Sequence, residues 1–235
     1  MTQVDLAEIL GMMEKVGWPL HAVEVDSPEF TQIPEQWRPI VLSSGPDAHR
    51  RAALALWNRE FLGLMPNFTE LFRTQLVDVR VYDSVAAPIL LYLAKGVGKE
   101  HLVWVGRDPR TFGEPPPFWD MLPETARTFL RDVHAGFTAP DRESFGLMHP
   151  AHMETIAAMA GSPDGIPDWD ETAAEHGRIL STRLLRVTRD AGNLLFCVSP
   201  DLSVGEAALV FEGDIDPQDF WLAFDELMTS AFEES

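Results

Sequence analysis

The sequence predicts an α+β protein, with helices flanking a mixed, largely antiparallel sheet. Three short apolar runs at residues 77–83, 88–94 and 101–107 are strand-like, and two more follow at 182–189 and 193–199. Amphipathic segments of helical period lie before, between and after these runs. Groups of strands that alternate with groups of helices along the chain are typical of this fold class.

The N-terminal half begins with a helical pattern at residues 4–16, which Gly17 should end. The alternating stretch at 21–26 indicates a short strand. Residues 45–65 predict one helix with Asp47 as its N-cap. The segment 95–99 between the second and third strand-like runs should form a hairpin loop.

A helix is predicted from Leu122 to Gly136, directly after a proline run at 115–117. Pro123 suits its first position, and Gly136 suits the residue just past its end. His134 would lie in the last turn, where a positive charge interacts favourably with the helix dipole. Downstream, residues 150–161 suggest a short helix, 161–171 an acidic loop, and 206–212 a strand.

The last predicted helix has a strong start signal. Asp216 is the expected N-cap, Pro217 the first helical residue, and Asp219 the third. An apolar stripe then follows at helical spacing, formed by Phe220, Phe224, Leu227 and Ala231.

Charge is the most informative feature of the composition. The net charge is −19, and residues 113–235 hold 23 acidic side chains against 7 arginines and no lysine. Direct contact with nucleic acid is not expected, because phosphate contacts depend on Lys and Arg. The sequence shows neither a secretory signal nor a membrane span, so a cytoplasmic protein is expected. Cys197, the single cysteine, is expected to be a small buried hydrophobe.

Two acidic patches are the candidate interaction sites. The first lies in the expected loop, where Trp169 is a possible hot-spot anchor among acidic residues: Asp164, Asp168, Asp170, Glu171 and Glu175. The second is Glu212 with Asp214. A solvated acidic surface is the plainer interpretation of both patches and stays open.

No catalytic, cofactor or metal site is predicted. The chain lacks a Gly-x-Ser-x-Gly elbow, and "GVGKE" lacks the spacing of a phosphate-binding loop. The acidic patches lack the order of an EF-hand. His149 and His152 lack the spacing of a helical zinc motif, and a surface position is expected for them.

Residues 118–235 resemble the SUKH superfamily. The similarity rests on "LPETARTFLRDVHAGF", "FGLMHPAHMETI", "GNLLFCVSPD" and "AALVFEGDIDPQDFWLAFDELM", in the family's order. Ala135 stands where the family usually has Asn. Residues 1–112 have no matching counterpart, so we expect an N-terminal α/β region at 1–112, either a second domain or an elaboration, and a SUKH-like domain at 113–235.

The resemblance implies a binding protein rather than an enzyme. SUKH proteins are largely bacterial immunity proteins that neutralise toxins, commonly nucleases or deaminases, and eukaryotic relatives act as adaptors. The expected partner is therefore a cognate toxin with a basic cleft, which an acidic surface could cover quickly through electrostatic steering. An adaptor without a toxin partner and an unrecognised hydrolase remain the alternatives.

Overall fold

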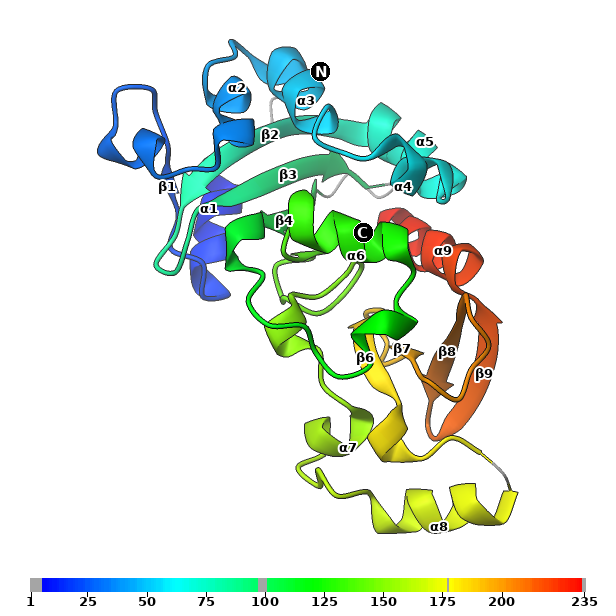
Figure 1. The fold of residues 1–235 in the computed structure, drawn as a ribbon. Helices are drawn as coiled ribbons and strands as arrows, with labels where there is room; N and C mark the ends of the chain where they lie inside the picture. The colour runs from blue at the N-terminus through cyan, green and yellow to red at the C-terminus, as the bar shows by residue number, and fades with distance from the viewer. Residues whose placement is uncertain (1–5, 97–100, 177, 234–235) are drawn as a thin grey trace.

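The computed structural model describes residues 6–96, 101–176 and 178–233 as two antiparallel sheets with helices around them (Figure 1). The α+β class and the antiparallel pairing are confirmed. The helices are α1 (Leu6–Lys15), α2 (Arg38–Val41), α3 (Pro46–Leu54), α4 (Arg59–Gly63), α5 (Pro66–Gln75), α6 (Glu124–Asp132), α7 (Ile156–Met159), α8 (Pro167–His176) and α9 (Phe220–Glu233).

The first sheet has the order β1-β2-β3-β4-β5. Its strands are β1 (His21–Ala22), β2 (Leu76–Asp83), β3 (Ile89–Lys95), β4 (His101–Arg107) and β5 (Phe137–Thr138). The three long predicted strands are confirmed, whereas the strand expected at 21–26 is only two residues long. The hairpin loop expected at 95–99 falls largely on 97–100, outside the described residues.

Both faces of the first sheet are covered, so β3 is buried along almost its whole length. Leu90 and Tyr92 face the large core formed with α3 to α6 and α9, while Leu91 and Leu93 face α1. Because neither face meets water, the strand is a continuous apolar run rather than an alternating one.

The single helix predicted at 45–65 is in fact two, α3 and α4. Gly45, at φ +83°, is the N-cap of α3, and Asp47 lies in its first turn beside Arg50. The chain then leaves the helix, and the Asn58 side chain accepts a hydrogen bond from the Glu60 amide to start α4. The sequence prediction missed Asn58 as a second cap.

Helix α6 is shorter than predicted. Pro123 is its N-cap residue rather than its first helical residue, and the helix ends at Asp132. His134 therefore lies in the core, with Nε2 2.8 Å from the hydroxyl of Tyr92. Burial lowers the pKa of His134 to about 3, so it is neutral and does not act on the helix dipole. Gly136, at φ +120°, is packed against the backbone of His149 rather than capping the helix.

The second sheet has the order β6-β7-β8-β9. Its strands are β6 (Leu185–Arg189), β7 (Leu195–Val198), β8 (Glu206–Phe211) and β9 (Asp214–Asp219). Phe196 and Val198 pack with α9 in the large core. The opposite face forms a smaller cluster that includes Cys197, which is fully buried as predicted, and Trp169 of α8.

The predicted start of the last helix is wrong. Residues 214–219 form the edge strand β9, where Pro217 is tolerated because an edge residue need not donate to the ladder. Asp219 is the cap instead, since its Oδ1 accepts the amides of Trp221 and Leu222 at 3.0 and 2.9 Å. The apolar stripe of α9 is buried as predicted.

The two halves of the chain share one core. β5 pairs with β4, so the first sheet takes its last strand from beyond residue 113. The carboxylate of Asp225 on α9 accepts hydrogen bonds at the start of α5. The division at 112/113 stays a prediction. None of the helices in the described ranges has the length and apolar character needed to cross a membrane.

Candidate functional site

The second part of the expected acidic loop at 161–171 is helical, because α8 begins at Pro167, whereas residues 161–166 are a turn region as predicted. Figure 1 shows α8 at the far end of the second sheet from α9. Pro167 stands at its first position, and Asp168 and Asp170 lie in its first turn. Negative charge at this end of a helix interacts favourably with the helix dipole. Trp169 fixes the helix to the protein, because its ring packs in the smaller cluster and Nε1 donates to the carbonyl oxygen of Ile179 at 3.1 Å.

Asp170 faces the protein rather than solvent. Its Oδ1 accepts the amide of Ser181 at 2.7 Å, and its Oδ2 accepts the Ser181 hydroxyl at 3.0 Å. A Cβ on Gly165 would collide with the same carboxylate. Asp170 therefore holds the ends of the α8 segment together and is not available to a partner in this conformation.

The other acidic residues of this segment differ in position. Asp168 and Glu171 are exposed on α8, and Asp164 is exposed in the turn before it. Glu175 belongs to α8, but its side chain lies outside the described residues.

The turn between β8 and β9 carries the second acidic patch. Phe211 pairs with Asp214, so Glu212 and Gly213 form a two-residue hairpin loop, with φ of +49° and +91°. Two positive φ values in a row are typical of a type I′ turn, in which Asn, Asp or Gly is usual at the first position. Glu212 is thus a residue type rarely found in this conformation, a feature that occurs more often at functional sites.

Helix α8 and this turn face each other across a groove of about 480 Å³. Its lining includes Asp168, Trp169, Glu212 and Asp214, so it contains residues from both predicted patches. A Cβ placed on Gly213 would lie 3.9 Å from Cζ3 of Trp169, so the turn lies beside the indole ring. Residues from two patches that are 37 positions apart in sequence therefore lie on one surface.

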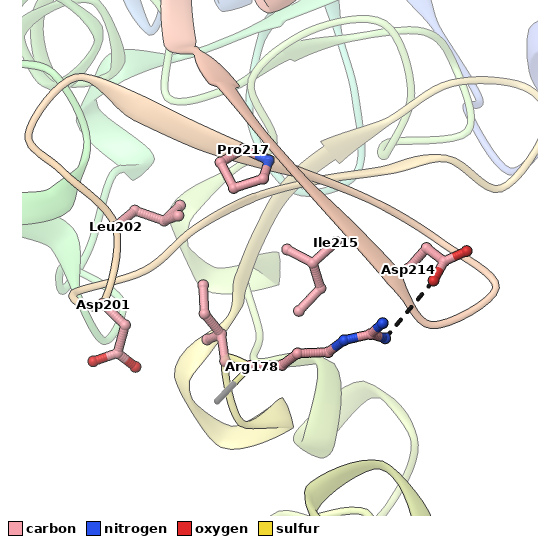
Figure 2. A pocket seen from close by; sticks show the side chains of 7 residues that line it. Arg178, Asp201, Leu202, Asp214, Ile215 and Pro217 are labelled. Carbon is pink, nitrogen blue, oxygen red and sulfur yellow. Dashed lines mark ion pairs between the residues drawn. The ribbon is translucent and has the colours of Figure 1, made fainter. Parts of the chain in front are cut away.

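Arg178 is the cation of this groove, and its sequence context predicts no role for it. Its Nη1 lies 3.7 Å from Oδ1 of Asp214, and both side chains are largely exposed (Figure 2). An exposed pair of this kind contributes little to stability, so a partner can displace it at low cost.

A smaller pocket of about 320 Å³ shares Arg178, Asp214 and Ile215 with the groove. Figure 2 shows the residues that line it. Leu202, Ile215 and Pro217 give it apolar walls, and Asp201 lies at its edge. Asp201 is held by Arg183, whose Nη2 donates to its Oδ1 at 2.7 Å. Sequence patterns missed this pocket because its residues come from three separate segments.

The histidine prediction is wrong for His149, which is buried. Its Nδ1 accepts the Ala151 amide at 3.1 Å and its Nε2 donates to the Thr111 carbonyl at 2.9 Å, so both nitrogens are used. His152 is partly buried. Among the described residues, no group of three or more His, Cys, Asp or Glu side chains is arranged to hold a metal ion.

Comparisons with protein-family models, curated proteins and solved structures found no match to this chain. The SUKH resemblance therefore stays a prediction.

Proposed function

We propose that this chain is an immunity protein that binds and neutralises a basic bacterial toxin acting in the cytoplasm on nucleic acid or nucleotides. The observation that supports it is the convergence of Asp168, Glu212 and Asp214 around Trp169 at one groove. The chain's role is to cover the active-site cleft of the toxin, without chemistry of its own.

The groove has the features that recognition of a basic surface needs. Asp168 and Glu212 are exposed and have no ion pair with a described residue. Their charge adds to a net of −19, which raises the rate of encounter with a cationic partner. Trp169 offers a fixed aromatic surface between them, and Trp is enriched among residues that dominate binding energy.

Replacement of the Arg178–Asp214 ion pair by a pair with the toxin would make binding selective for the matching partner. Asp214 already holds a guanidinium, that of Arg178, at 3.7 Å in an exposed pair. An arginine of the toxin can take this position, because the replaced pair contributes little. Arg178 would then repel partners whose cations do not match the groove.

The test is protection of cells against the product of the adjacent reading frame. That product is expressed from an inducible promoter, together with this chain or with the variant Asp168→Lys/Glu212→Lys/Asp214→Lys. The chain should relieve growth arrest and the variant should not, because the reversed charges repel the toxin.

A variant with the same change in charge elsewhere is the control. Glu14, Glu24 and Asp26 are exposed acidic residues near the N-terminus, outside the groove. Glu14→Lys/Glu24→Lys/Asp26→Lys should protect as well as the original chain. Equal protection by the groove variant would contradict the proposal, and a non-toxic adjacent product that still binds would indicate an adaptor instead.

A further inference from the structure

A cationic cluster lies on the first sheet, around Trp18. The indole ring is buried and fixed, since Nε1 donates to the carbonyl oxygen of Pro140 at 2.8 Å. The guanidinium carbons of Arg107 and Arg142 lie over this ring, at 5.3 and 4.5 Å from its centroid. One comes from the end of β4 and the other from the turn after β5, so the fold brings two cations together where α1 ends.

Arg107 is unusual among the arginines of the chain. It is partly buried, yet its guanidinium forms no ion pair or hydrogen bond with a described residue. Every other described arginine that is at least partly buried pairs with a carboxylate: Arg38, Arg50, Arg80, Arg127, Arg183, Arg186 and Arg189. Burial, and then repulsion from Arg142, lowers the pKa of Arg107 to about 10. A cation withdrawn from water without an anion is costly, and an anionic ligand would remove the cost.

Arg142 is held in position by its backbone. It has a φ of +75°, which is uncommon for a residue other than glycine, and its Nη2 donates to the carbonyl oxygen of Gly17 at 3.2 Å. The same indole ring therefore carries a second guanidinium, whose charge acts on Arg107. Guanidinium groups are strong donors to anions, and an anion would offset the repulsion between these two.

His152 lies within range of the charges of both arginines. Its imidazole forms no hydrogen bond with a described residue, and burial, followed by Arg107 and Arg142, lowers its pKa. Glu143 and Glu154 act on it in the opposite sense. Glu143 is held by Arg186 and Arg189 at 3.1 and 3.2 Å, however, and Glu154 is exposed. The carboxylates nearby therefore do not neutralise the two arginines.

We propose that Arg107 and Arg142 at Trp18 form a binding site for the phosphate group of a small soluble ligand. Two guanidinium groups offer paired donors that match the oxygens of a phosphate. The two formal positive charges match a phosphate dianion better than a single carboxylate. None of these residues lines the acidic groove, so this site is independent of the proposed function.

Calorimetric titration at constant ionic strength tests this site. Inorganic phosphate and adenosine monophosphate are the probes, and succinate is the comparison ligand, with carboxylates in place of phosphate. Both phosphate probes should bind saturably, and succinate much more weakly. Arg107→Gln and Arg142→Asn should each weaken phosphate binding at least about tenfold, the effect of losing one charge-assisted hydrogen bond. Asn is chosen at 142 because it adopts positive φ more readily than most residues.

Arg131 provides a matched control. It lies over the rings of Phe112 and Trp119 at 5.6 and 5.2 Å and has no ion pair with a described residue, but no second arginine of the described ranges lies over those rings. Arg131→Gln should leave phosphate affinity within about twofold, because Arg131 lies over other rings than Trp18. The proposal is overturned if phosphate does not bind saturably, if succinate binds as tightly, or if Arg131→Gln loses as much affinity as Arg142→Asn.

Discussion

Gly213 in the hairpin turn lies beside the indole ring of Trp169, since a Cβ at this position would be 3.9 Å from Cζ3. Trp169 and Gly213 thus bring α8 and the β8–β9 turn together, and the two acidic segments line one groove. The conformation of the turn is therefore as important to the groove as the charges that it carries.

Substitution of Gly213 by Ala should lower the free energy of unfolding by about 1 kcal/mol, because its φ of +91° disfavours any residue with a Cβ. Chemical denaturation measures this change. Gly11→Ala is the control: Gly11 lies within α1 with open space around its Cα, so the same substitution should stabilise the protein. A Gly213→Ala protein as stable as the original would show that the turn is not strained by a side chain.

Asp170 and Asp168 lie two residues apart and should respond differently to loss of charge. Asp170→Ala leaves the buried Ser181 amide and hydroxyl without an acceptor and should cost about 1–3 kcal/mol of stability. It should also expose α8 to limited proteolysis. Asp168→Ala should change stability by less than about 0.5 kcal/mol while weakening partner binding. The reverse pattern would contradict the roles assigned to these two residues.

Asp225 is buried, and it connects the C-terminal helix to the N-terminal half. Its carboxylate accepts the backbone amides of Asn67 and Phe68 at 3.1 and 2.7 Å and the Asn67 side chain at 2.9 Å. Asp225→Asn replaces one acceptor oxygen by a donor, and should lower the free energy of unfolding by about 2 kcal/mol. Glu226→Gln, one residue further along and exposed, should have almost no effect in the same denaturation experiment. Equal stability of the two variants would rule out this connection as a stabilising one.

Stability should fall as the pH drops below about 6.5, the ordinary pKa of histidine. Burial lowers the pKa of His134 to about 3, so the unfolded chain takes up a proton that the folded chain does not. Neutral His134 contributes fully to the free energy of unfolding above the pKa of the unfolded chain. This contribution decreases by about 1.4 kcal/mol per pH unit as the pH falls toward the folded pKa. Denaturation between about pH 7 and pH 5 measures the slope. His134→Gln should make the slope less steep but not remove it, because burial also lowers the pKa of His149 to about 4. An unchanged slope would mean that His134 is protonated in the folded protein.

The sequence predicts the strands of the first sheet well because their apolar runs reflect burial directly. β2, β3 and β4 are bounded by polar or turn-forming residues, and α9 carries its stripe of Phe220, Phe224 and Leu227. A pattern of this kind depends on which side chains are buried, so it can be recognised without knowledge of the tertiary structure.

The secondary-structure predictions are wrong where one local sequence pattern is compatible with two kinds of structure. Asp216 and Pro217 match the start of a helix, but the ladder with β8 makes them an edge strand. The α8 segment resembles a loop in sequence because Gly and Pro precede it and its buried face is small, with Trp169 and Ala173. The groove itself is beyond sequence patterns, since it depends on a hairpin that places Gly213 against Trp169.

The most direct test of the proposed function is the association rate of the toxin with this chain as a function of ionic strength. The original chain should associate quickly at low salt and lose that rate steeply as salt is added, because screening weakens attraction between the acidic groove and a basic cleft. Asp168→Lys/Glu212→Lys/Asp214→Lys should associate slowly and with little salt dependence, while Glu14→Lys/Glu24→Lys/Asp26→Lys should keep most of the original rate. Similar rates and salt dependence for the groove variant and the original chain would contradict the role of the acidic groove in toxin binding.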